Sequence, residues 1–181
     1  MGNDDPSSFD KSAFDFRQFG RMFEDFHVGQ TFEHRRGRTM ESADSVTFCA
    51  ATCNWSPLYL DKSFATANGH PERPINPALV ASVVIGLTVE DLSEIAGPFL
   101  GMESCVFERS VYPGDTLTAT SKVLECRLSK SRVGSGVVTW QTVGLNQRGE
   151  TVLTLVRSNL VKNRVAEPSV TGLTTVSKAS T

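Results

Sequence analysis

The feature that most constrains the fold is an apolar run over residues 78–89, which holds no charged side chain and follows Pro77. Its β-branched content favours a strand on propensity alone, but the run is long for a strand. Proline is favoured in the first turn of a helix, and the small residues of the run would let a helix approach a sheet closely. We therefore predict a buried helix, apolar all round, that continues to about Ile95 and is ended by residues 97–98.

The sequence after this run has the pattern of strands. Its segments are of strand length, show alternation, and are separated by turns rich in Gly, Pro, Asp and Asn. The predicted strands cover residues 100–112, 116–130, 136–146 and 151–163. One long helix with four or five antiparallel strands predicts an α+β layered architecture.

Shorter elements are expected before the apolar run. Residues 31–40 have the pattern of a short strand, and Ser42 is a plausible N-cap for a helix that runs to Cys53. Pro57 then allows a second short helix, which Gly69 would close.

The length of 181 residues fits one domain, which we place at residues 21–164. Residues 1–20 are expected to form a flexible arm and residues 165–181, rich in Ser, Thr and Ala, a flexible tail. A net charge of −2 gives no indication of nucleic acid as a partner. No segment has the ~18 consecutive apolar residues of a membrane span, so no membrane partner is expected.

The four cysteines show no CxxC spacing and no histidine pattern that would complete a zinc site. The N-terminus is polar and acidic, unlike a secretory signal. We therefore expect a cytoplasmic protein with reduced cysteines and no metal.

The segment 48–61 carries the most informative motif, with Asn54, Pro57 and Tyr59 at a recognisable spacing. It resembles the active-site segment of MaoC-like enoyl-CoA hydratases, in which an Asp and a His stand where Asn54 and Tyr59 stand here. Further similarities are found in segments 23–30, 111–117 and 146–150. Together they cover residues 23–164 and imply a hotdog fold, an antiparallel sheet wrapped around one long buried helix.

A subgroup of this family, the mesaconyl-CoA (β-methylmalyl-CoA dehydratase) and itaconyl-CoA hydratases, is similar in more detail. Its members also carry Asn in place of the acid, and segments similar to 73–76, 86–93 and 129–132. The resemblance implies a hydro-lyase acting on a short branched or dicarboxylic enoyl-CoA, with no cofactor beyond the CoA of the substrate. It also implies a homodimer or heterodimer of hotdog domains. The alternative is a non-catalytic subunit that binds the thioester and pairs with a partner carrying the Asp/His dyad.

Hydration of an enoyl thioester requires a group that positions water, a proton donor for the α-carbon, and hydrogen-bond donors for the enolate oxygen. Asn54 does not titrate, but it can orient water or hold the thioester; the other interpretation is a turn residue before Pro57. Tyr59 is a better proton donor than base; the other interpretation is a buried ring with a hydrogen-bonded hydroxyl.

The resemblance places the enolate donor at the start of the long helix. That position holds Pro77, which has no N–H, so the donor would come from Ala78, Leu79 or the Asn76 side chain. The N-terminus of the helix still favours a developing negative charge.

Three cations are candidates for binding the CoA phosphates, namely Arg73, Lys130 and Arg132. A charged hairpin is also commonly just a solvated turn. Two further residues are candidate bases, His70 in the loop before the long helix and Asp44 near the motif; each could equally be a solvated surface side chain.

Overall fold

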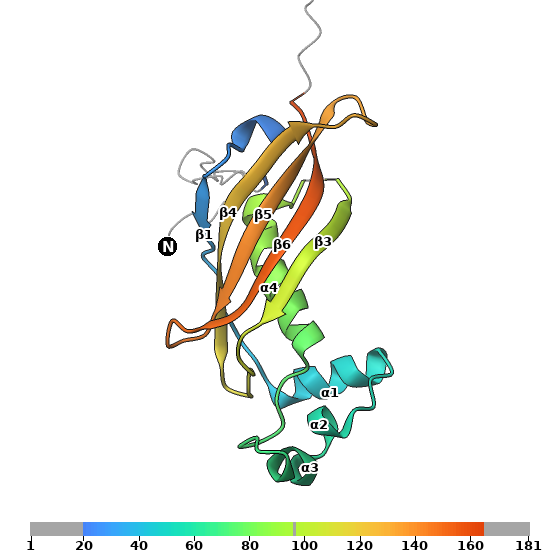
Figure 1. Cartoon of the computed structure of the whole chain (residues 1–181), viewed down its shortest axis with the longest axis vertical. Helices are drawn as coiled ribbons and strands as arrows, with labels where there is room; N and C mark the ends of the chain where they lie inside the picture. Colours follow the sequence, from blue (N-terminus) through green and yellow to red (C-terminus); the bar gives the residue numbers. More distant parts are fainter. Residues whose placement is uncertain (1–19, 96, 165–181) are drawn as a thin grey trace, which may run out of the picture.

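The computed structural model describes residues 20–95 and 97–164. The predicted arm and tail, apart from Gly20, lie outside the described residues. Figure 1 shows a long sheet that lies across one long helix, α4, with the short helices α1, α2 and α3 gathered at one end.

Strands β1 to β6 form one antiparallel sheet in the order β1-β4-β5-β6-β3, with β2 paired to β4. Their bounds are β1 Thr31–Glu33, β2 Arg38–Thr39, β3 Phe99–Phe107, β4 Thr116–Leu128, β5 Ser135–Leu145 and β6 Thr151–Lys162. The four strands predicted in the second half are confirmed. The strand predicted at residues 31–40 is divided into β1 and β2, and β3 ends five residues earlier than predicted, because residues 108–112 form a loop.

Helix α4 spans Pro77–Leu92, with Asn76 as its N-cap and Ser93 as its C-cap. The predicted start is confirmed, whereas the predicted end near Ile95 is wrong by about one turn. Complete burial is also wrong, because the sheet covers only one face of the helix. The opposite face exposes small residues one turn apart, namely Ala78, Ser82 and Gly86.

The main core lies between α4 and the sheet. Val80 and Val84 of the helix belong to the same buried cluster as Leu117 and Leu153 of the strands. The helix approaches β5 closely at Gly144, where an added Cβ would lie 2.8 Å from a methyl group of Val84. Burial of this apolar surface holds the start of α4 in a fixed position relative to the end of the sheet.

The three short helices are α1 Ser42–Ala51, α2 Pro57–Leu60 and α3 Lys62–Ala67. Ser42 is the first helical residue of α1, and the N-cap is Glu41, whose N–H bonds the Asp44 carboxylate at 3.0 Å. The single helix predicted after Pro57 is divided at Asp61, whose carboxylate accepts the N–H groups of the first turn of α3. This cap competes with a continuous helix, which accounts for the division.

No helix in the described part of the chain is both long enough and apolar enough to cross a bilayer.

Candidate active site

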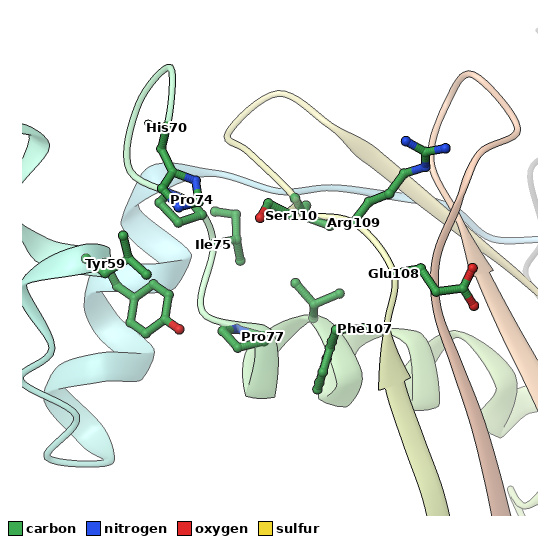
Figure 2. Close-up of a pocket in the computed structure, with 12 residues that line it drawn as sticks. Tyr59, His70, Pro74, Ile75, Pro77, Phe107, Glu108, Arg109 and Ser110 are labelled. Atoms are coloured by element: carbon green, nitrogen blue, oxygen red, sulfur yellow. The ribbon is translucent and has the colours of Figure 1, made fainter. Parts of the chain in front are cut away.

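A cavity of about 310 Å³ lies between the short helices and the end of β3, beside the first turn of α4 (Figure 2). Tyr59 and His70 line it from the helical side, and Pro77 and Val80 from α4. The last residue of β3, Phe107, and the loop residues after it, as far as Val111, form another wall. The cavity thus lies where the sequence analysis placed the thioester, at the start of the long helix.

Tyr59 lies in α2, and Figure 2 shows its hydroxyl directed toward Pro77. Burial raises the pKa of Tyr59 above its ordinary value of 10.0, and the nearby Cys49 raises it further. The hydroxyl therefore remains protonated at neutral pH and is available as a proton donor.

His70 lies in the loop between α3 and α4 and reaches the same cavity. Its Nδ1 is 2.9 Å from the Tyr112 hydroxyl, which fixes the orientation of the ring. Tyr112 in turn donates its backbone N–H to Asp115 at 2.9 Å, in the turn before β4. His70 was predicted from the sequence as a candidate base. Tyr112 was not predicted, because the segment 111–117 was considered only for its similarity to the family.

The side chain of Asn76 is fully engaged at the start of α4. Its Oδ1 accepts the N–H of Ala78 at 3.0 Å, and its Nδ2 lies 3.6 Å from the sulfur of Cys49. Pro77 has no N–H, and within the described residues no hydrogen bond is found for the N–H of Leu79. Of the three donors expected for an enolate, the N–H of Leu79 is therefore the one without a partner among the described residues. None of Asn76, Ala78 and Leu79 is itself among the residues that line the cavity.

Asn54 does not line the cavity. Its Oδ1 accepts the N–H of Ser56 at 3.4 Å, immediately before α2. It follows Cys53, which has a positive φ of 55°. This geometry is that of a turn residue, the second of the two roles considered for Asn54.

Arg73 and Asp44 make structural contacts away from the cavity. The Arg73 guanidinium donates to the carbonyl of Leu60 at 3.2 Å and to the hydroxyl of Ser42 at 2.7 Å. Asp44 caps α1 and forms an ion pair of 2.8 Å with Arg38. Both side chains therefore stabilise the group of short helices, and neither is presented to the cavity.

Lys130 and Arg132 line a second cavity of about 460 Å³, together with Arg127 and the start of β3. Figure 1 shows the β4–β5 hairpin that carries them at the opposite end of the sheet from α1, α2 and α3. Within one chain, these cations are therefore not close to Tyr59 and His70.

Comparisons with known proteins identify the family of this chain. The family model for mesaconyl-CoA hydratase matches residues 4–181. The chain belongs to the mesaconyl-CoA hydratase family. A relative from Haloarcula hispanica named mesaconyl-CoA hydratase is 37% identical over 158 residues, which cover 87% of this chain and 44% of the relative. A β-methylmalyl-CoA dehydratase from Chloroflexus aurantiacus is 39% identical, over 80% of this chain and 41% of the relative.

Solved structures confirm the fold of this mesaconyl-CoA hydratase family member. A MaoC domain protein dehydratase from Chloroflexus aurantiacus superposes with a TM-score of 0.76 at 38% identity, over 81% of this chain and 41% of that one. A Mycobacterium tuberculosis protein described as a double hotdog has a TM-score of 0.72 at 24% identity, over 80% and 44%. The predicted hotdog fold is thus confirmed. The chain spans less than half the length of the curated relatives named above.

Proposed function

We propose that this chain adds water to, or removes it from, the double bond of a short branched or dicarboxylic enoyl-CoA of the mesaconyl-CoA or itaconyl-CoA type. The observation that carries the proposal is the shared cavity of Tyr59 and His70 beside the start of α4, in a member of this family. The reaction is acid–base chemistry, so it needs no cofactor beyond the CoA of the substrate.

The start of α4 is the proposed site of the thioester carbonyl. The N–H of Leu79 and the positive end of the helix would stabilise the negative charge that develops on the oxygen. Ile75, Val80 and Phe107 form apolar walls for the acyl chain. Such walls shield the acyl chain from part of the solvent, which strengthens the electrostatic interactions beside it.

The proton transfers are assigned to Tyr59 and His70, which line the cavity from the side of the short helices. In hydration, His70 takes a proton from water as the water oxygen bonds to the β-carbon, and the electrons of the double bond move to the thioester oxygen. Tyr59 then donates its proton to the α-carbon as the carbonyl re-forms. The proton held by His70 returns through solvent to the Tyr59 phenolate. Dehydration is the reverse sequence.

The second candidate is a non-catalytic subunit that binds the thioester and pairs with a partner carrying the Asp/His dyad. The observation that favours it is the amide of Asn54, which cannot titrate and is directed to the N–H of Ser56 rather than to the cavity.

We also infer that two hotdog domains pair through the edge strand β3, as a homodimer or with a similar partner. Five apolar residues of β3 are between 41% and 56% exposed, namely Phe99, Leu100, Met102, Val106 and Phe107. The face of α4 that the sheet does not cover is exposed as well. Large exposed apolar surfaces mark interfaces, so both features favour pairing. The relatives named above have about twice the length of the matched region, which is room for a second domain.

Such a pair would place the candidate phosphate site beside the acyl cavity. In an antiparallel pair of β3 strands, the start of one strand lies beside the end of the other, at a spacing of about 4.8 Å. The start of β3 borders the cavity of Lys130 and Arg132, whereas its end borders the cavity of Tyr59. We therefore assign Lys130 and Arg132 to the CoA phosphates of the substrate bound by the partner domain.

The test is an assay of the purified protein with mesaconyl-, itaconyl- and crotonyl-CoA, followed by loss of the enoyl-thioester absorbance. Turnover of a C5 substrate that is lost in His70→Asn is the expected result. Thioester binding without turnover, followed by turnover on addition of a subunit carrying the dyad, would establish the non-catalytic alternative instead.

A further inference from the structure

We propose that Arg109 selects dicarboxylic enoyl-CoA substrates by binding their free carboxylate. The inference rests on the proposed function, since it concerns the acyl end of the same cavity. Arg109 lies in the loop after β3 and belongs to the lining of the cavity. It played no part in the sequence analysis, because nothing in its immediate neighbours distinguishes it from a surface arginine.

The charge of the cavity lining makes Arg109 distinctive. Among the described residues that line the cavity, it is the single lysine or arginine. Figure 2 places the loop of Arg109 and Ser110 across the cavity from Tyr59. A short acyl chain whose thioester lies between Tyr59 and α4 would therefore extend toward this loop.

The guanidinium of Arg109 is only loosely engaged by the protein. Its NH1 lies 3.9 Å from Glu150, and its side chain is 56% exposed. Glu150 has closer partners, because its Oε2 accepts from Arg148 and from Asn146 at 2.8 Å each. A substrate carboxylate would therefore compete with a long, solvent-screened contact rather than with a tight ion pair.

The neighbouring acid does not oppose this role. Glu108 also belongs to the lining, but its Oε1 accepts the hydroxyl of Thr154 at 2.8 Å, on the adjacent strand β6. Figure 2 shows its carboxylate directed away from Tyr59. A rotation of the Arg109 side chain toward the cavity is thus not blocked by a competing carboxylate within it.

Arginine suits this task because its planar guanidinium can bind both oxygens of a carboxylate. The histidine of the lining, His70, is held through Nδ1 by Tyr112. Binding of the free carboxylate by Arg109 leaves His70 available for the proton transfer.

The experiment compares Arg109→Met with wild type on mesaconyl-CoA, which carries a free carboxylate, and on crotonyl-CoA, which does not. We expect kcat/KM to fall roughly tenfold to a hundredfold for mesaconyl-CoA and to change less than about threefold for crotonyl-CoA. The matched control is Arg148→Met. It also removes an arginine that pairs with Glu150, but Arg148 does not line the cavity. If the ratio of kcat/KM for mesaconyl-CoA to that for crotonyl-CoA is the same in Arg109→Met and in wild type, the inference is overturned.

A binding measurement separates this inference from the proposed activity. Calorimetry with succinyl-CoA and butyryl-CoA, which cannot be hydrated, needs no turnover. Wild type should bind succinyl-CoA more tightly than butyryl-CoA, and Arg109→Met should abolish that preference. If wild type binds both ligands equally, the selection by Arg109 is refuted, even where the hydratase activity is present. If wild type prefers succinyl-CoA but turns over no enoyl-CoA, only the proposed activity fails.

Discussion

The imidazole of His70 and the hydroxyl of Tyr112 form a hydrogen bond of 2.9 Å that joins the loop before α4 to the loop after β3. The two residues are 42 positions apart in the sequence. One partner of the pair lines the cavity, and the other holds it in place. The orientation of the candidate base therefore depends on a residue outside the cavity lining.

Tyr112→Phe tests this dependence. It removes the hydroxyl but retains the ring and the backbone N–H that bonds Asp115, so the fold should be preserved. We expect kcat to fall about tenfold or more through misorientation of His70, with KM little changed and the pH profile displaced. Steady-state kinetics between pH 6 and 9 give the answer. An unchanged pH profile would mean that Tyr112 has only a structural role.

Tyr59→Phe tests the proton donor. The raised pKa keeps the Tyr59 hydroxyl protonated, so its removal should lower kcat by roughly 10²–10⁴-fold. Because the substitution retains the ring, thermal unfolding should be nearly unchanged. Turnover close to wild type would transfer the proton donation to another group and leave Tyr59 as a wall of the cavity.

The sequence predicted more of the fold than of the candidate site. The helix α4 and the strands of the second half follow from hydrophobic patterns that extend over ten residues or more, and these patterns were sufficient. The break at Asp61 was not predictable in the same way, because a single side-chain cap decides it. Local contacts of this kind compete on nearly equal terms with continuation of the helix.

The site depended on contacts that no local pattern encodes. Tyr59 and His70 were both candidates, yet only the fold shows that they share one cavity. The wall that holds Arg109 is formed because β3 ends early, at a residue whose neighbours still have a strand-like pattern. Lys130 and Arg132 were chosen by resemblance, and their distance from Tyr59 within one chain could not be read from it.

Asn76→Ala should destabilise the start of α4. The substitution removes the acceptor for the N–H of Ala78 and the donor to Cys49, in a side chain that is 1% exposed. Loss of an N-cap costs about 0.5–2 kcal/mol in the free energy of unfolding. Asn76→Asp retains the capping oxygen and serves as the matched control. Urea denaturation should rank the stability as wild type, then Asp, then Ala; equal stability of wild type and Ala would contradict the assigned cap.

His34 should make the stability depend on pH. The buried ring lies between Asp91 at 2.8 Å and Ser121 at 2.9 Å, and burial lowers its pKa below 6.5, with Arg157 and Arg21 adding to the effect and Asp91 opposing it. Between the lowered pKa of the native state and pH 6.5, the unfolded chain therefore binds a proton that the native state does not bind. The free energy of unfolding should decrease as the pH falls through this range.

The comparison that isolates this effect is urea denaturation of wild type, His34→Asn and His27→Asn at pH 7.5 and 5.5. His27 is exposed, so its variant should behave as wild type does. The His34 variant should show a smaller difference between the two pH values, whatever its absolute stability. A difference equal to that of wild type would assign the pH dependence to other groups.

Mixing of two inactive variants tests whether the site is shared between domains of a homodimer. Tyr59→Phe disables the acyl cavity and leaves the β4–β5 hairpin intact. The double variant Lys130→Ala/Arg132→Ala removes the cations of the hairpin and leaves the acyl cavity intact. If the cations act on the substrate of the partner domain, a heterodimer of the two variants contains one intact combination. Random reassociation makes half of the dimers heterodimers, so an equal mixture should recover about a quarter of the wild-type turnover.

The control mixture combines Tyr59→Phe with His70→Asn. Both changes affect the same cavity, so every site in the heterodimer lacks one of the two groups and no recovery is expected. Recovery only in the first mixture would place the hairpin of one domain at the cavity of the other. Absence of recovery in a mixture shown by light scattering to be dimeric would mean that Lys130 and Arg132 do not act across the interface. A monomer at micromolar concentration would exclude the shared site altogether.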